Sequence, residues 1–343
     1  MKIRFATPEE LSTWDEIIPR NPGGGNVLQG AVFARLKQIS GWTTRAIVCD
    51  TGAMTVLEKH IPLFGKLWYM PKGPGVASAA QLGNILAELT PFAHAHGVFT
   101  IKIEPELPLG TNLSHLGLIP TRPIQYNAST VVVNLTSPLE EVLAHLPQKG
   151  RHAIKRAERD GVTVQAVDST SEHCDQMYEL FEQTAQGAGF VIRSRDYYHE
   201  FYQQFSEAGQ GQLFFAYFNG NVVAGAYALL YGHKSTYKDG ASIREKITYG
   251  ASHYLQWKVI EWAKQQGSHE HDLCGTPPAT AITDVNHPFY GLGRFKTSFN
   301  KQVTDYVGAF EVPIAGWKSK LWTRYIEKLV RRLYFKRTHE SYY

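Results

Sequence analysis

The stretch ASHYLQWKVIEWAKQQG, residues 251–267, decides how the second half of the chain folds. Its apolar residues recur at helical spacing, and its closing glycine is typical of a helix end. The elements around it are, in order, a hairpin at 213–231, a strand at 235–238, a loop at 239–242 and a strand at 271–274. The hairpin turn is Asn219-Gly220, a pair that favours tight β-turns. This order of elements predicts an α/β unit built on a mostly antiparallel sheet.

The same order of elements occurs earlier in the chain. When Gly97 is aligned with Gly267, Ala93 falls on Ala263, although the identity between the two copies is weak. The elements of the earlier copy are strands at 43–49, 54–57 and 67–70, a loop at 72–75, a helix at 78–96 and a strand at 99–103. We therefore predict a tandem duplication of one α/β domain, with mixed, mostly antiparallel sheets flanked by helices.

A domain boundary is predicted near residue 137. Ser137, Pro138 and two acidic residues form a typical helix start there. We predict a first domain of residues 1–137 together with 309–343, and a second domain of residues 138–308. The C-terminal segment should form a basic helix that packs on the first domain. Its apolar residues at helical spacing are Leu321, Trp322, Tyr325, Ile326, Leu329 and Leu333.

The positive charge of the chain is concentrated in that C-terminal helix. The net charge is +4 over 343 residues, whereas residues 317–337 contain eight Lys or Arg and one Glu, which is +7 and leaves −3 for the rest. Such asymmetry points to a polyanion or an anionic membrane face as partner. The simpler alternative is an amphipathic helix whose basic face is only solvated.

Cysteine usage and hydropathy restrict the class of protein. The three cysteines are dispersed and include no CxxC pair, which argues for a reducing compartment and against disulfides or structural zinc. No apolar run reaches the roughly 18 residues of a membrane span. The first residues read as a strand and not as a signal peptide. We expect a cytoplasmic monomer, with the hypothesis of a peripheral contact at the inner face of the plasma membrane.

A glycine-opened basic segment follows the second copy of the repeat. It reads Gly291-Leu-Gly-Arg-Phe-Lys-Thr-Ser-Phe299 and places Phe295 and Lys296 side by side. An aromatic ring beside cations suits a flat, anionic ligand. By itself, this segment is more typical of a solvated surface loop.

The ordered motifs of the whole chain resemble the Fem (FemABX) aminoacyltransferases, which build peptidoglycan interpeptide bridges. The motifs are Phe33…Lys37…Gly41-Trp42, Ile101–Pro105, Lys149–Ala157 with Gly161, Arg193…Tyr197, Tyr249–Ser252, Trp257…Gly275 and Gly293–Lys296 with Phe299. The resemblance implies two tandem domains like GCN5-related N-acetyltransferases (GNAT-like). Some members carry a long antiparallel helical arm. This sequence has no such insertion, so it resembles the arm-less, FemX-like members.

The resemblance implies transfer of an amino acid from aminoacyl-tRNA to the diamino-acid side-chain amine of a precursor pentapeptide. The implied acceptor is UDP-MurNAc-pentapeptide or lipid II. An aminoacyl ester is already activated, so no cofactor is expected. The reaction needs the amine positioned against the ester, stabilisation of the tetrahedral intermediate and removal of an amine proton.

Site residues follow from the matched motifs. Lys296 and Phe295 correspond to residues near the tRNA end, where Lys296 would neutralise a phosphate or the oxyanion and Phe295 would stack on a base. Glu104 corresponds to an acid that orients the amine or accepts its proton; the alternative is a strand-end residue before Pro105. The residues implied in binding the precursor are Lys37, Phe99, Arg193, Tyr197 and Tyr237. Lys37 and Arg193 match contacts to the diphosphate, and Phe99 stands where the family can have Tyr.

Two other classes of function remain open at this point. A GNAT-type acyl-CoA N-acyltransferase would need a pyrophosphate-binding loop, and Ile247-Thr-Tyr-Gly250-Ala matches that pattern only at Gly250. A non-catalytic RNA- or membrane-binding protein is supported only by the basic C-terminal helix. No metal site is expected, because the His94/His96 and His269/His271 pairs lack further ligands at recognisable spacing.

Overall fold

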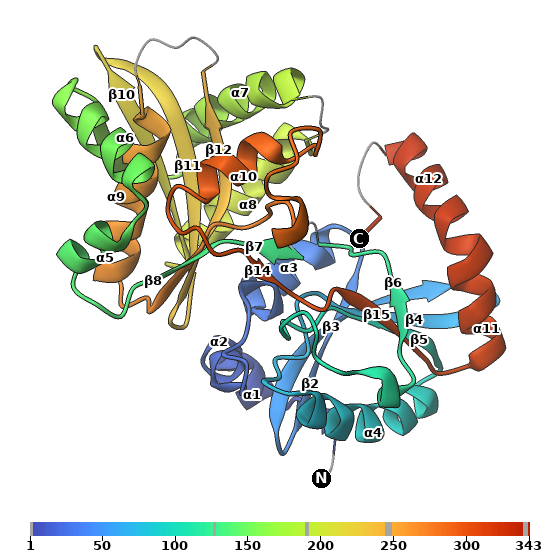
Figure 1. Ribbon diagram of the computed structural model, residues 1–343. Helices are drawn as coiled ribbons and strands as arrows, with labels where there is room; N and C mark the ends of the chain where they lie inside the picture. Colours follow the sequence, from blue (N-terminus) through green and yellow to red (C-terminus); the bar gives the residue numbers. More distant parts are fainter. Residues whose placement is uncertain (1–2, 126–127, 189–191, 244–248, 339–341) are drawn as a thin grey trace. The chain divides into compact units, whose positions relative to one another are not determined.

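The computed structural model describes residues 3–125, 128–188, 192–243, 249–338 and 342–343. Two compact units share the chain (Figure 1). The first contains Met1–Ala128 and Asp305–Tyr343, and the second contains Ser129–Thr304. Short strands β7 (Ser129–Thr130) and β14 (Thr304–Asp305) pair where the chain passes from one unit to the other.

The first unit is built on a sheet of seven strands within the described residues. In spatial order these are β1 (Arg4–Phe5), β2 (Thr43–Cys49), β3 (Gly52–Ile61), β4 (Gly65–Met70), β5 (Val98–Ile103), β15 (Ala309–Pro313) and β6 (Ile119–Thr121). Neighbours are antiparallel except for the parallel pair β4–β5. Helix α4 (Ala79–Ala95) joins these two strands, as a parallel connection requires.

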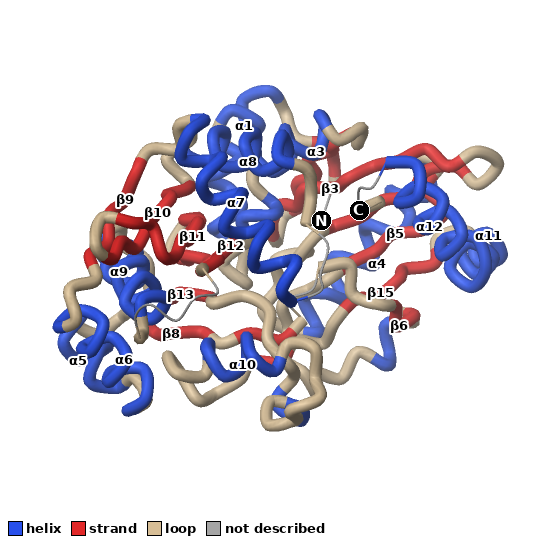
Figure 2. The backbone as a smooth tube through the Cα atoms, turned by 90° about the horizontal axis from the view of Figure 1, so that it is seen from above, coloured by secondary structure: helices blue, strands red, loops and turns tan. Residues whose placement is uncertain are grey.

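Helices cover both faces of this first sheet (Figures 1 and 2). The apolar face of α4 forms the main core with residues such as Trp68 and Ile101. Helix α3 (Ala31–Ile39) and a C-terminal helix pack on the opposite face. The C-terminal helix consists of α11 (Gly316–Leu321), the π-helical turn η5 (Trp322–Ile326) and α12 (Glu327–Thr338). Two short helices, α1 (Pro8–Ser12) and α2 (Trp14–Ile17), precede α3.

The second unit repeats this architecture, with a sheet of six strands among the described residues. Their spatial order is β8 (Val132–Asn134), β13 (Glu270–Asp272), β12 (Lys234–Ser242), β11 (Asn221–Tyr231), β10 (Gly211–Phe218) and β9 (Thr163–Val167). Only β12 and β13 are parallel. Helix α9 (Ala251–Gln265) joins them, so the predicted duplication into two mostly antiparallel α/β units is confirmed.

Helices also sandwich the second sheet (Figure 2). Helices α5 (Leu139–His145), α6 (Gln148–Arg159) and α9 pack on one face, where they form a continuous apolar core with β10 and β11. Helices α7 (Ser171–Ala188) and α8 (Arg195–Glu207) cover the other face. Helix α7 has 18 residues. Helix α10 (Tyr290–Lys296) includes the first six residues of the glycine-opened basic segment, which was expected to be a loop.

The observed unit boundaries differ from the predicted ones at 137 and 308. Strand β8 lies before residue 137, yet it pairs with β13 in the second unit's sheet. The segment after Thr304 belongs to the first unit, because Leu109 donates its backbone N–H to the Asp305 carbonyl and Val307 donates to Leu107. Backbone hydrogen bonds with distant segments therefore determine the boundaries, and the helix-start signal at Ser137 does not coincide with them.

The C-terminal helix packs on the first unit as expected, but through a different face. Trp322 is fully buried against Phe64 and Phe99. Leu321, Tyr325, Leu329 and Leu333, which were predicted to make this contact, are exposed instead. The prediction was wrong about the buried face because polar partners on β5 and β15 orient the helix.

Those polar partners form a buried ion cluster in the first unit. Lys102 on β5 is 1% exposed, and its Nζ lies 2.9 Å from Glu327 on α12 and 3.6 Å from Glu311 on β15. Thr323 also donates a hydrogen bond to Glu311. Because a buried carboxylate without a counter-charge is costly, this cluster fixes the rotation of the helix on the sheet.

Lys102→Met should destabilise the first unit by about 3–5 kcal/mol, because it leaves two buried carboxylates without their cation. Urea unfolding followed by hydrogen exchange in β5 would measure the loss. Lys66→Met is the matched control, since Lys66 is partly exposed and only 3.6 Å from a single carboxylate; its effect should stay below about 1 kcal/mol. Equal effects of the two substitutions would contradict this account of the cluster.

Close packing in the second unit depends on Gly150 of α6. A Cβ atom at this position would lie 2.0 Å from the backbone oxygen of Ser298, just after α10. Gly150→Ala should therefore displace the 296–299 segment and lower stability by about 1–3 kcal/mol. Gly291→Ala on α10 is the control, because a Cβ there meets no atom within 4 Å. A thermal melt in which both variants unfold at the wild-type temperature would refute this reading.

Candidate functional site

The site in the second unit begins where two parallel strands part. Strands β12 and β13 pair over only three residues each: Lys234–Thr236 lies beside Glu270–Asp272. Strand β12 continues to pair with β11 as far as Ser242, whereas the chain leaves the sheet after Asp272. Cys274 then adopts a φ of 56°, which is uncommon for a residue with a side chain. The two strands therefore separate and leave an opening, in which backbone groups of the described segment after Asp272 make no hydrogen bonds with β12.

Lys296 closes this opening from α10. Its Nζ donates hydrogen bonds to the backbone carbonyls of Cys274 at 2.7 Å and Gly275 at 2.6 Å. The residue is only 6% exposed, and burial lowers the pKa of its amine. An ammonium group has three donors, so one remains without a partner in the described part of the chain.

Phe295 connects α10 to the other side of the opening. Its ring centroid lies 6.5 Å from that of Tyr237 on β12 and 4.9 Å from that of His253 on α9. Burial, with Asp239 nearby, raises the pKa of Tyr237. The Tyr237 ring folds over Gly240, where an added Cβ would lie 1.6 Å from the hydroxyl oxygen. The predicted residues Lys296, Phe295 and Tyr237 therefore border one opening.

A β-bulge on β12 adds a lysine that the sequence reasoning did not select. The register between β11 and β12 shifts so that Lys238 has no opposite residue. Its Nζ lies 3.0 Å from Asp239, which also accepts a hydrogen bond from the Tyr202 hydroxyl. Burial lowers the pKa of Lys238, but Asp239, Tyr197 and Cys274 raise it above its ordinary value. A strand that reads Lys-Asp-Gly was the available signal, since bulges often accompany glycine and active sites.

Arg193 and Tyr197 lie together at the start of α8. The Arg193 guanidinium lies 4.5 Å from the centroid of the Tyr197 ring, a cation–π contact. Tyr197 is partly exposed, whereas the neighbouring Tyr198 is 6% exposed and belongs to the core. Because Tyr197 interacts electrostatically with Lys238, this pair belongs to the same region as the bulge.

The other three predicted site residues lie in the first unit. Lys37, in the last turn of α3, is 5% exposed and lies 5.3 Å from the centroid of the Phe33 ring. Both carboxylate oxygens of Glu104 are engaged: one accepts from the Tyr69 hydroxyl at 2.6 Å and the other from the backbone of Ile124 and Gln125. These contacts hold a loop and favour the structural interpretation of Glu104.

Phe99 does not fit the predicted role in substrate binding. It is 1% exposed and packs against Phe64 and Trp322 beneath the C-terminal helix. Its backbone oxygen also accepts a hydrogen bond from Ser319 at 2.6 Å. The structure therefore places Phe99 in the core, and we remove it from the candidate site.

Two tyrosines at positions 342 and 343 fill the region between Trp42 and Tyr69. The Tyr343 ring stacks on Trp42 at 5.9 Å, meets Tyr69 at 5.4 Å and donates its hydroxyl to Glu327 at 2.6 Å. Lys59 donates to the Tyr342 carbonyl at 2.9 Å. Burial lowers the pKa of Lys59 to about 8, while the surrounding rings favour its charged form. This aromatic cluster was not predicted.

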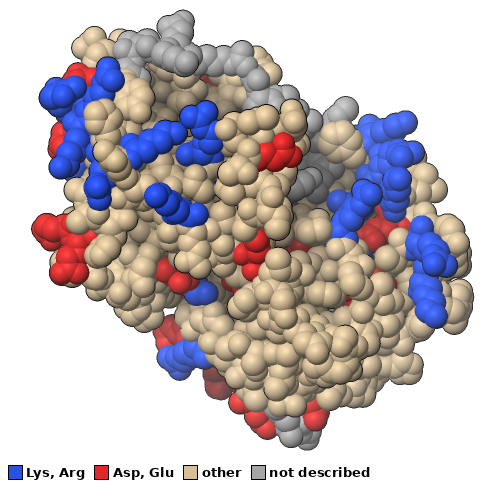
Figure 3. Space-filling model, in the orientation of Figure 1, with Lys and Arg blue, Asp and Glu red and all other residues tan. Residues whose placement is uncertain are grey.

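Basic residues form a second feature of the second unit, on α6. A cavity of ≈ 450 Å³ is lined by Gln148, Lys149, Arg151, His152, Lys155 and Tyr249. Arg156 lies 4.8 Å from the centroid of the Tyr249 ring. Figure 3 shows blue side chains gathered over this part of the unit. Cations around an exposed aromatic ring suit a nucleotide with its phosphates.

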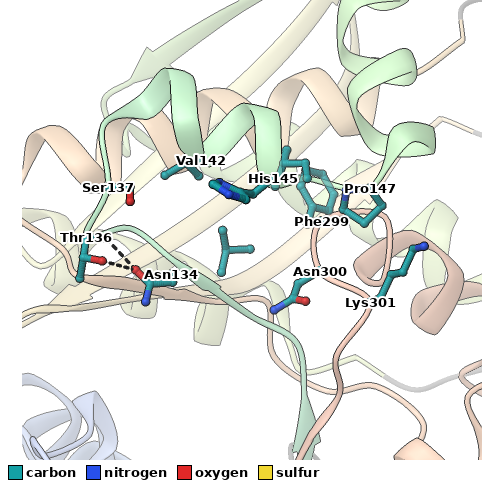
Figure 4. Close-up of a pocket in the computed structure, with 11 residues that line it drawn as sticks. Asn134, Thr136, Ser137, Val142, His145, Pro147, Phe299, Asn300 and Lys301 are labelled. Carbon is teal, nitrogen blue, oxygen red and sulfur yellow. Dashed lines mark hydrogen bonds between the residues drawn. The ribbon is translucent and has the colours of Figure 1, made fainter.

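Another cavity, of ≈ 590 Å³, lies between α5, β8 and residues 299–301 (Figure 4). His145, Asn300 and Lys301 line it, and Asn134 is held by two hydrogen bonds from Thr136. Phe299 also lines it and contacts Phe295 at a centroid distance of 5.4 Å. Phe299 therefore lies between this cavity and the opening at Lys296.

Two buried histidines of this unit should make its stability depend on pH. Burial lowers the pKa of His253 to about 4 and that of His271 to about 3. An unfolded histidine titrates near 6.5, so the unfolded chain binds more protons as the pH falls from 6.5 to 4, and the free energy of unfolding decreases. Each histidine should lower the free energy of unfolding by up to about 1.4 kcal/mol for each unit of pH over this range.

Urea unfolding of the second unit at pH 7, 6, 5 and 4 would measure this dependence. His253→Phe should keep the contacts with Phe295 and Phe299. It should also remove the contribution of His253 to the pH dependence of the free energy of unfolding and leave that of His271. An unchanged pH dependence in this variant would show that His253 does not titrate in the way described.

Comparisons with known proteins agree with the architecture. The family described as "Acetyltransferase (GNAT) domain" matches residues 148–281. The structure "Crystal structure of FemX" superimposes with a TM-score of 0.80 at 20% identity, over 95% of this chain and 100% of that one. The second unit is therefore a GNAT-type domain, and the two-unit fold is that of FemX.

Two staphylococcal enzymes are among the relatives of this chain. "Lipid II:glycine glycyltransferase" of Staphylococcus haemolyticus is 20% identical over 382 residues, and its namesake from Staphylococcus aureus (strain MRSA252) is 22% identical over 384 residues. Each alignment covers 87% of this chain and 90% of the relative. These matches support an enzyme that transfers acyl or aminoacyl groups. Together with the FemX-like fold, they agree with the resemblance to the FemABX family that the sequence motifs indicated.

Proposed function

We propose that this protein is a non-ribosomal aminoacyltransferase that uses aminoacyl-tRNA. It would transfer the amino acid to the side-chain amine of the diamino acid in a peptidoglycan precursor pentapeptide. The relatives named lipid II:glycine glycyltransferase support both the aminoacyl group and this class of acceptor. The interpeptide bridge of the cell wall is the expected product.

The observation that carries the proposal is the position of Lys296. Two carbonyl oxygens hold its amine at the opening between β12 and β13, and one donor is left. Attack of an amine on an ester produces a tetrahedral intermediate with a negative oxygen. A fixed donor in a buried site stabilises that oxygen more strongly than a mobile one in water.

The basic surface of α6 supports a polyanionic donor. The cavity beside Tyr249 brings together three Lys or Arg side chains with one aromatic ring. Such a surface suits the phosphates and a base at the end of a tRNA. Phe295, which was predicted to stack on a base, contacts His253 and Phe299 and remains a proposed contact for the terminal nucleotide.

Arg193 and Tyr197 are proposed to bind the precursor. The guanidinium matches a diphosphate in charge and geometry, and the Tyr197 ring beneath it restricts its orientation. Tyr237 is also proposed to bind the precursor. Lys37, in the first unit, is proposed to contact the diphosphate of the precursor. Glu104 is retained only as a weaker candidate for the proton acceptor, because its oxygens already accept three hydrogen bonds.

A GNAT-type acyl-CoA N-acyltransferase is the second candidate. The family match over residues 148–281 favours it, and so does Gly250 at the start of α9, where such enzymes bind pyrophosphate. However, Gly250 has a φ of 81°, and an added Cβ would lie 2.3 Å from the Ala153 oxygen. Packing against α6 therefore accounts for this glycine without a ligand. Ile247 and Thr248 of the compared loop lie outside the described residues.

One assay distinguishes the two candidates. The purified protein would be incubated with a pool of charged tRNAs and UDP-MurNAc-pentapeptide or lipid II, and in parallel with acetyl-CoA. We expect incorporation of an amino acid into the precursor from aminoacyl-tRNA. Acyl transfer from acetyl-CoA without any transfer from aminoacyl-tRNA would refute the proposal in favour of the second candidate.

Lys296→Met should lower kcat by roughly 10²–10³-fold, because it removes the donor that faces the developing oxyanion. Precursor binding, measured by calorimetry, should change little. Arg294→Met is the matched control: Arg294 lies on the same helix but is exposed, and its loss should leave kcat within about twofold. If Lys296→Met weakens binding and turnover equally, or unfolds at a much lower temperature, its two carbonyl contacts are only structural.

A further inference from the structure

The C-terminal helix of the first unit presents an apolar stripe to solvent. Trp317, Leu321, Tyr325, Leu329 and Leu333 follow one another at intervals of four residues along α11, η5 and α12. Their exposed fractions are 69%, 38%, 65%, 53% and 55%. Exposed large apolar side chains in a continuous row are unusual on a soluble surface and indicate an interaction site.

The π-helical turn keeps this stripe in line. In an α-helix with 3.6 residues per turn, a spacing of four rotates each successive residue by about 40° around the axis. The turn η5 at Trp322–Ile326 has wider i→i+5 bonding and therefore winds more slowly. It turns Tyr325 back toward the line of Trp317 and Leu321, so that the row continues onto α12.

A row of cations runs beside the stripe. Lys320, Arg324, Lys328 and Arg332 also follow at intervals of four, each one residue before a member of the stripe, and all are exposed. Figure 3 shows Lys and Arg side chains gathered over the C-terminal helix, at the right of the view. The helix therefore has an apolar line bordered by positive charge.

The opposite face of the helix fixes its orientation. Trp322 is buried against Phe64 and Phe99, and Glu327 is bound to Lys102 in the buried ion cluster. The stripe therefore cannot rotate inward without breaking both contacts.

We propose that this face docks on the surface of an anionic lipid bilayer. The helix would lie in the plane of the interface, with Leu329 and Leu333 among the acyl chains and with Trp317 and Tyr325 at the level of the headgroups. The Lys and Arg row would contact lipid phosphates, each cation adding to the attraction by a negative surface. No helix in the described residues is long and apolar enough to cross a membrane, so the contact is peripheral.

The composition of the face favours lipid over two other partners. An RNA would bind the cations but would leave the leucines of the stripe unburied. A second copy of the chain, packed stripe to stripe, would bring two basic rows close together, and like charges at an interface oppose association. A negatively charged membrane satisfies both the apolar stripe and the basic row.

Vesicle flotation of the full chain tests the proposal, with phosphatidylcholine vesicles compared with vesicles that also contain phosphatidylglycerol. We expect binding to the anionic vesicles that weakens with added salt. Leu329→Ser with Leu333→Ser should reduce the partition coefficient at least about tenfold. The matched control is Leu11→Ser with Leu109→Ser, which changes two leucines that are 51% and 64% exposed and lie outside the C-terminal helix; it should bind like the wild type.

A second pair of variants tests the cations. Lys328→Gln with Arg332→Gln should weaken binding to anionic vesicles by about tenfold or more. Arg20→Gln with Lys301→Gln is the control, because both side chains are exposed and lie outside the C-terminal helix and α6. Melting temperatures within a few degrees of the wild type would show that each variant is folded.

Three results would overturn the proposal. The first is a wild-type protein that does not float with anionic vesicles. The second is a stripe variant that floats as well as the wild type. The third is a change in oligomeric state, or in affinity for tRNA, on substitution of the stripe or of the cations, without any vesicle binding; these outcomes would identify a second copy or an RNA as the partner. None of them depends on catalysis, so the proposed aminoacyl transfer is tested separately.

Discussion

The early parting of β12 and β13 is the constraint on which the candidate site depends. Because these strands pair over only three residues each, the carbonyls of Cys274 and Gly275 lie outside the sheet ladder, and Lys296 binds them. The lysine is thus attached to the end of β13 as well as to its own helix. The contact of Gly150 with the Ser298 backbone holds the segment from the other side. The same contacts that place α10 therefore also orient the amine proposed to act in the reaction.

Local signals in the sequence were sufficient for much of the fold. Strand 43–49, the Asn219-Gly220 hairpin and helix 251–265 were predicted at or near their observed bounds, because turn residues and apolar periodicity act over short distances. The C-terminal helix shows where this reasoning ends. Its pattern shows which residues share a face, but the buried face is selected by Lys102, which lies 225 positions away from Glu327 in the sequence.

The candidate site was predictable only in part, for a similar reason. Lys296, Phe295 and Tyr237 were selected by resemblance and border one opening. Lys238 was missed, because its place depends on a bulge in the register between two strands and not on periodicity within one strand. Phe99 does not join them, because its side chain lies under a helix from the far end of the chain.

Tyr342 and Tyr343 would couple the binding of any ligand in their place to the packing of α12. They occupy the space between Trp42, Lys59 and Tyr69, so any ligand that reaches these three side chains must displace them. Its apparent affinity is then its intrinsic affinity multiplied by the fraction of molecules in which the space is open. Tyr343 also bonds Glu327 in the ion cluster. By thermodynamic reciprocity, an occupant of this space would weaken the attachment of α12 to the sheet, and a firmly attached α12 would oppose that occupant.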